Sequence, residues 1–209
     1  GGIWVRARHG AARTALRRAT GALPHPMAQI HPNMDDTALY GGVDVSATLA
    51  AGHLQHSSGL ADRSGILELT MAERATGAFG ARLAGLIDQE THAVICLDES
   101  AGPDEVPPLS LTDRLAFFVD LDDVSIRDID AFDSFDADVP LANPRPDDAA
   151  QLTSTALALG ISSLRAVQLA SRTARVLAGL AGFEETTDQD LALAVQVVFA
   201  HRATVRPDV

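Results

Sequence analysis

GIWVRARHGAARTALRRA, residues 2–19, sets the architecture of the first part of this chain. The run Ile3 to Val5 has the apolar character of a short buried strand, and the residues after Gly10 favour a helix. A strand followed by a tight turn and a helix start is where many α/β proteins hold a phosphate, because N–H groups at a helix N-terminus attract anions. We therefore interpret residues 2–19 as the first strand and helix of an α/β domain.

Three further apolar runs have the length of buried strands: GILEL (65–69), HAVICL (92–97) and LAFFVDL (115–121). Helix-like stretches cover residues 10–23, 44–54 and 77–90. Strands that alternate with helices predict a parallel sheet covered by helices on both faces. The chain of 209 residues, 46% of them hydrophobic, is long enough to bury the core of such a domain.

The composition changes after residue 121. Eight aspartates lie between residues 120 and 138, and three prolines follow within PLANPRPDD. The aspartates lack the spacing of a calcium loop, so the segment predicts a solvated acidic surface and no metal site. We assign residues 1–124 to the α/β core, 125–146 to an acidic connector and 147–209 to a small helical domain.

The helical domain has two clear sequence signals. Thr187 with Asp190 predicts a capping box that starts the last helix. In the helix before it, the residues expected on one face are Leu169, Thr173, Val176, Leu177 and Leu180. Those expected on another face are Arg165, Gln168, Arg172 and Arg175.

Charge and composition exclude several classes of function. The net charge is −12, which argues against nucleic-acid binding, because a protein neutralises phosphates with Lys and Arg. No window approaches the roughly 18 to 20 apolar residues of a membrane span, and we expect neither a transmembrane segment nor a signal segment. The single cysteine, Cys96, lies in an apolar run, which favours a buried thiol and a cytoplasmic protein.

All sixteen basic residues are arginines, and this affects the turn after the first strand. A working phosphate loop has the order Gly-x4-Gly-Lys-Ser/Thr, in which the lysine reaches the β- and γ-phosphates and the hydroxyl holds Mg²⁺. This pattern can be aligned with the chain in two registers. Its last three positions, Gly-Lys-Ser/Thr, then fall on Ala11-Ala12-Arg13 or on Ala12-Arg13-Thr14. Gly10 is the one glycine close to these positions. A degenerate loop would consist of Gly10, Ala11, Ala12, Arg13 and Thr14. An arginine does not reproduce a compact ammonium, so weak nucleotide binding stays open and efficient hydrolysis is not expected. Ordinary α/β scaffold is the alternative.

Several longer stretches carry a resemblance to a known family. IHPNMDDTALYGGVDVSATLAAG (30–52) and SGLADRSGILEL (58–69) resemble the AAA+ domain of the magnesium chelatase ATPase subunit. LSLTDRLAFFVDL (109–121) is similar to its arginine-finger segment, ISSLRAVQLASRTARVLAGL (161–180) to its sensor-2 helix, and TTDQDLALAVQVVFAHRAT (186–204) to the last helix of its lid. The resemblance implies an AAA+ P-loop-type sheet followed by an all-helical lid.

The departures from that ATPase pattern are similar to those of its companion subunit in magnesium chelatase, whose AAA+ domain is degenerate in this family. Where Walker B needs Asp-Glu after its strand, this chain has Thr70 and Met71. Glu68 lies two residues early and Glu73 two residues late. Where sensor 1 needs a polar side chain, Ser100 alone is near. The lysine, the magnesium ligand and the carboxylate that positions water are all missing, which indicates a retired active site.

Two arginines stand where the family has functional ones. The resemblance implies that Arg114 is an arginine finger that acts on a neighbouring subunit's nucleotide, and that Arg165 is the sensor-2 arginine. For Arg114 the alternative is a surface ion pair with Asp113 or Asp104. For Arg165 the alternative is a helix-start salt bridge to the Asp-rich connector.

The resemblance also implies a function. The family enzyme uses ATP to insert Mg²⁺ into protoporphyrin IX on the route to chlorophyll or bacteriochlorophyll. We expect this chain to assemble in a ring with the magnesium chelatase ATPase subunit, which holds ATP and Mg²⁺, and to act with the large porphyrin-binding subunit. The alternatives are an autonomous AAA+ ATPase such as a MoxR-type chaperone, and a structural scaffold in which Arg114 has no role.

Overall fold

The computed structural model describes residues 1–63, 65–102, 104–125, 127 and 139–205. They form two compact units. An α/β unit contains Gly1–Thr112 and the described residues from Val119 to Arg127, and a helical unit contains Asp113–Phe118 and residues 139–205. Much of the expected connector, residues 126 and 128–138, lies outside the described residues.

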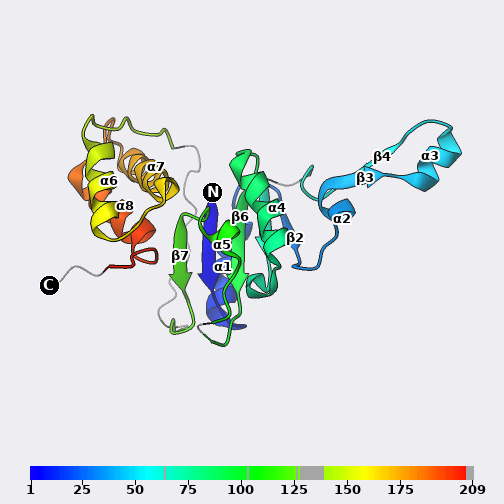
Figure 1. Ribbon diagram of the computed structural model, residues 1–209, viewed down its shortest axis with the longest axis horizontal. Helices are drawn as coiled ribbons and strands as arrows, with labels where there is room; N and C mark the ends of the chain where they lie inside the picture. The colour runs from blue at the N-terminus through cyan, green and yellow to red at the C-terminus, as the bar shows by residue number, and fades with distance from the viewer. Residues whose placement is uncertain (64, 103, 126, 128–138, 206–209) are drawn as a thin grey trace. The chain divides into compact units, whose positions relative to one another are not determined.

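The α/β unit is built on a five-stranded sheet with the strand order β2-β5-β6-β1-β7 (Figure 1). The strands are β1 (Gly2–Arg6), β2 (Met27–Ile30), β5 (Ile66–Leu69), β6 (Ala93–Asp98) and β7 (Phe117–Asp120). The pairs β2–β5, β5–β6 and β6–β1 are parallel. The four strands predicted from apolar runs are confirmed, as is the parallel sheet. Strand β2, which lies at the edge of the sheet, was not predicted.

Helices lie between the strands of this unit, and one of them, α4, begins at a side-chain cap. Helix α1 (Ala11–Gly21) follows β1, and α4 (Gly77–Asp88) begins after Thr76, whose hydroxyl accepts the Phe79 N–H at 3.2 Å. The 3₁₀ turn η1 (Ala72–Arg74) follows β5, and the short helix α5 (Leu109–Thr112) precedes β7. Strands β5 and β6 are buried almost throughout, as expected for parallel strands covered on both faces.

A small second sheet, formed by β3 (Gly41–Val43) and β4 (His56–Ser58), is antiparallel and was not predicted. Helix α2 (Asp36–Tyr40) precedes it, and α3 (Val45–Ala51), within the predicted stretch 44–54, connects its strands (Figure 1). Gly41, with φ of 78°, lies against the chain near Gly59 so closely that a Cβ on either residue would come within 2.1–2.3 Å of backbone atoms. Only glycine fits these two positions.

The helical unit packs α6 (Asp148–Ala158), α7 (Leu164–Leu180) and α8 (Asp188–Phe199) around one core. The predicted capping box is confirmed: the Thr187 hydroxyl accepts the Asp190 N–H at 3.3 Å, and the Asp190 carboxylate accepts the Thr187 N–H at 2.9 Å. The α8 helix therefore begins where the sequence predicts.

The residues expected on one face of α7 are buried to different extents. Thr173 is buried, and Leu169 and Leu177 pack at the border of the core, but Leu180 is 54% exposed. The buried stripe consists mainly of alanines: Ala166, Ala170, Ala174 and Ala178. Small side chains let the neighbouring helices approach α7 closely, so the closest contact follows the alanines and displaces the larger leucines to the flanks.

Candidate functional site

The first candidate site lies where the parallel strands of the α/β unit end. Arg6 of β1 is in register with Asp98 of β6, so the residues that follow these strands meet at one edge of the sheet. Gly10 precedes α1 without a side-chain hydrogen bond to cap the helix. The Thr14 hydroxyl, which a working loop would use for Mg²⁺, donates to the Gly10 carbonyl at 3.0 Å. Gly10 and the first turn of α1, which contains Ala11 to Thr14, thus follow β1 in the chain, and the Thr14 hydroxyl is already bonded within that turn.

The Arg13 side chain in the first turn of α1 is nearly buried and is bound to a carboxylate. It is 10% exposed, and its Nη1 lies 2.7 Å from Oε1 of Glu99, just beyond the end of β6. The Glu99 N–H in turn donates to Oε2 of Glu73 at 3.0 Å. Arg13, the cationic residue that would have to take the place of the phosphate-loop lysine, is therefore paired with a carboxylate of the same protein.

Glu68, one of the two carboxylates that lie two residues from the Walker B positions in the sequence, is also paired. It is 1% exposed, and Arg17 of α1 binds both of its oxygens, with Nη2–Oε1 at 2.5 Å and Nε–Oε2 at 3.2 Å. Glu73 accepts the Glu99 N–H and pairs with Arg74 at 3.5 Å. Among the residues that the structure describes, no group of three or more His, Cys, Asp or Glu side chains could hold a metal ion.

Sequence reasoning missed a buried carboxylate at the same edge. Asp98 ends β6, is fully buried and accepts hydrogen bonds from Trp4 Nε1 and from the Ser100 N–H, both at 2.9 Å. Arg6 Nε lies 3.6 Å from the same carboxylate. An aspartate directly after an apolar strand was the available signal. Ser100, at the sensor-1 position, is 4% exposed, and its hydroxyl has no hydrogen-bond partner among the described residues.

The thiol of Cys96 takes no part in this site. Burial raises the pKa of Cys96, and the charge of Asp98 acts in the same direction. A buried thiol with a raised pKa is a poor nucleophile, because the thiolate is the reactive form.

The second candidate site is the segment Asp113–Phe118, which belongs to the helical unit and contains Arg114. Arg114 is half-buried. The Asp113 carboxylate accepts a hydrogen bond from the Ser163 hydroxyl at 3.0 Å and pairs with Arg165 Nε at 3.4 Å. Arg165, in the first turn of α7, thus contacts Asp113, the residue directly before Arg114. The finger role of Arg114 and the sensor-2 role of Arg165 stay predictions.

Arg202 binds the other end of this segment, and sequence reasoning missed it. Its guanidinium donates to the carbonyl oxygens of Leu115, of Ala116 (3.2 Å) and of Val198 (2.6 Å). The neighbouring His201 lies with its ring centroid 5.8 Å from that of Phe118. No local pattern marks this arginine, because its contacts join residues far apart in the sequence.

His201 makes the helical unit sensitive to acid. Burial and the nearby Arg202 charge lower the pKa of His201 from 6.5 to about 4. In the unfolded chain this imidazole takes up its proton near pH 6.5, so folding loses stability as the pH falls from about 6.5 to about 4. We expect urea denaturation to show this loss, and His201→Gln to show a smaller one over the same interval. An identical pH dependence in the two proteins would contradict the assignment.

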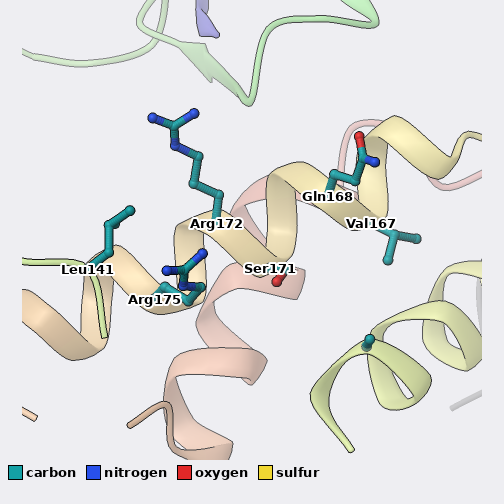
Figure 2. A pocket seen from close by; sticks show the side chains of 7 residues that line it. Leu141, Val167, Gln168, Ser171, Arg172 and Arg175 are labelled. Atoms are coloured by element: carbon teal, nitrogen blue, oxygen red, sulfur yellow. The ribbon is translucent and has the colours of Figure 1, made fainter. Parts of the chain in front are cut away.

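A shallow hollow of about 410 Å³ lies elsewhere on the helical unit (Figure 2). Its lining residues are Leu141, Ala149, Val167, Gln168, Ser171, Arg172 and Arg175. Figure 2 shows Arg172 extending away from α7, whereas Arg175 donates through Nε to the Ala142 carbonyl at 2.8 Å. Neither Arg114 nor Arg165 lines the hollow.

Comparison with known proteins identifies relatives along almost the whole chain. Residues 149–209 match the AAA lid domain family. The chain is 43% identical to the magnesium-chelatase 60 kDa subunit of Cereibacter sphaeroides and 41% identical to that of Rhodobacter capsulatus, each over 97% of this chain. It spans 38% of the length of these relatives.

Two crystal structures resemble the fold at low sequence identity. An ATPase candidate from Cytophaga hutchinsonii has a TM-score of 0.72 and 12% identity, over 99% of this chain and 79% of that one. A full-length MCM homologue from Methanopyrus kandleri has a TM-score of 0.61 and 14% identity, over 94% of this chain and 49% of that one. With the lid family, the first of these confirms the predicted AAA+ fold class. No described helix is both long enough and apolar enough to cross a membrane.

Proposed function

Since this chain belongs to the family of magnesium-chelatase 60 kDa subunits, we propose that it is the AAA+ module of such a subunit. In this role it assembles with the magnesium chelatase ATPase subunit and with the large porphyrin-binding subunit, in the ATP-dependent insertion of Mg²⁺ into protoporphyrin IX. The observation that carries the proposal is the identity of 41–43% over 97% of the chain. Chlorophyll or bacteriochlorophyll synthesis is the process served.

The module itself does not hydrolyse ATP in this proposal. Phosphoryl transfer needs a cation on the β- and γ-phosphates and an acidic ligand for Mg²⁺. Two ion pairs support the proposal, because Arg13 is bound to Glu99 and the buried Glu68 is bound to Arg17. The chain also has no lysine to replace Arg13. ATP and Mg²⁺ then belong to the ATPase subunit, at a site that Arg114 completes from the neighbouring position.

Titration with a fluorescent ATP analogue tests this part of the proposal. We expect no saturable binding by this chain alone, and binding once the ATPase subunit is added. Tight binding of Mg·ATP by the chain alone, with a turnover that Glu68→Gln abolishes, would contradict it. That result would instead favour an autonomous ATPase of the MoxR type.

Removing the partner of Arg13 is expected to restore some affinity for nucleotide. In Glu99→Ala the guanidinium at the start of α1 is no longer paired, and a charge-assisted hydrogen bond to a phosphate is worth about 1.5–3 kcal/mol, or roughly 10- to 100-fold in affinity. The same titration measures the gain. Glu105→Ala is the matched control, because it removes the same charge from the same loop; its affinity should stay at the level of the unmodified chain. Equal affinities for all three proteins would show that the ion pair does not close the site.

A further inference from the structure

The segment Asp113–Phe118 is attached to the helical unit at both ends. At its start, the Asp113 carboxylate is held by Ser163 and by Arg165 at the beginning of α7. At its far end, Phe117 packs against the helical core and the Phe118 ring lies near that of His201. Arg114 lies between these contacts, so its backbone position is set by residues of the helical unit.

Arg202 makes the most specific of these contacts. Its guanidinium binds three backbone carbonyls, those of Val198, Leu115 and Ala116. Leu115 and Ala116, the two residues after Arg114, are both buried, and Arg202 supplies hydrogen bonds to their carbonyls. The planar fork of an arginine can bind several acceptors in a fixed geometry, which the compact ammonium of lysine cannot reproduce.

We propose that Arg202 and Asp113 are positioning residues for Arg114. They fix the backbone on either side of it, so that the helical unit presents Arg114 to the neighbouring subunit. The inference rests on the proposed function, in which Arg114 contacts the neighbour's nucleotide. Neither positioning residue touches that nucleotide. A displacement of about 1 Å at a catalytic group costs on the order of 10²-fold in rate.

The experiment uses the protein that contains this chain, mixed with the ATPase subunit and Mg·ATP. Arg202→Met should lower the kcat of the stimulated ATPase roughly 10²-fold, with little change in KM, because the bound substrate keeps its contacts and loses only the aligned guanidinium. Asp113→Asn should lower kcat less, since it keeps the size of the side chain and weakens only the ion pair with Arg165. Arg172→Met, which removes an arginine of α7 outside these contacts, should leave both constants unchanged.

Combination with Arg114→Ala separates a positioning role from a general structural one. If Arg202 acts through Arg114, Arg202→Met causes no further loss of kcat in the Arg114→Ala background. A further loss of the same size in that background would overturn the inference, as would an unchanged kcat in both Arg202→Met and Asp113→Asn. If Arg114→Ala alone has no effect, the proposed function of Arg114 fails instead. Should Arg202→Met not fold, as judged by its circular dichroism, the milder Asp113→Asn decides by the same comparison.

Discussion

Arg114→Ala is expected to lower ATP turnover at the neighbouring subunit's site by roughly 10³- to 10⁵-fold, the contribution of an arginine finger to phosphoryl transfer. The guanidinium would stabilise the charge that develops on the transferred phosphoryl group, and alanine cannot replace it. Arg114→Lys should recover a small part of the rate, because it keeps the charge and loses the planar fork. The measurement is the steady-state rate of the ATPase subunit, titrated with the protein that contains this chain.

Arg172→Ala is the matched control, because it removes an exposed arginine from the same unit. Assembly, measured by analytical ultracentrifugation, should be unchanged in both variants. If the Arg114→Ala protein stimulates the ATPase subunit as strongly as the unmodified protein does, Arg114 is not a finger. The chain would then act as a structural scaffold.

The second large effect concerns stability. In Arg17→Met the carboxylate of Glu68, which is 1% exposed, loses the guanidinium that binds both of its oxygens. An uncompensated buried charge costs about 3–5 kcal/mol, and because Arg17 is itself partly exposed we expect about 3 kcal/mol. The melting temperature should fall by about 6–12 °C. Urea denaturation followed by the fluorescence of Trp4 measures the loss, since this single tryptophan lies in β1 of the α/β unit.

Two variants distinguish a lost ion pair from a lost side chain. Arg18→Met removes the adjacent, exposed arginine and should change the free energy of unfolding by less than about 0.5 kcal/mol. Glu68→Met combined with Arg17→Met removes both charges and should recover most of the stability, because apolar side chains can replace a buried ion pair. If Arg17→Met proves as stable as the unmodified chain, Glu68 does not need its partner.

The sequence was most informative where a strand is a continuous apolar run. Strands β5 and β6 are such runs because they are buried on both faces. Strands β1 and β7 are less buried but are apolar runs as well. Strand β2 could not be predicted in this way. It lies at the edge of the sheet, and its exposed residues alternate with partly or fully buried ones. The buried alanines of α7 were not singled out from the sequence, because hydrophobicity favours leucine, whereas close helix packing selects alanine.

The site was predictable only in part, for a related reason. Missing motif residues can be recognised along the chain, and the predicted loss of the ATPase machinery rests on them. The ion-pair partners of the remaining charged residues cannot be recognised in this way. Arg13 meets Glu99, and Arg17 meets Glu68, only when β1, β5 and β6 come together in the sheet. The contacts of Arg202 depend likewise on tertiary structure.

The alanine stripe of α7 has a mechanical consequence. Contacts made of methyl groups have no alternative rotamers, so the alanine face of α7 offers little room for side-chain rearrangement. We therefore expect the helices packed on this face to move together, and the segment Asp113–Phe118, which they hold, to move with them.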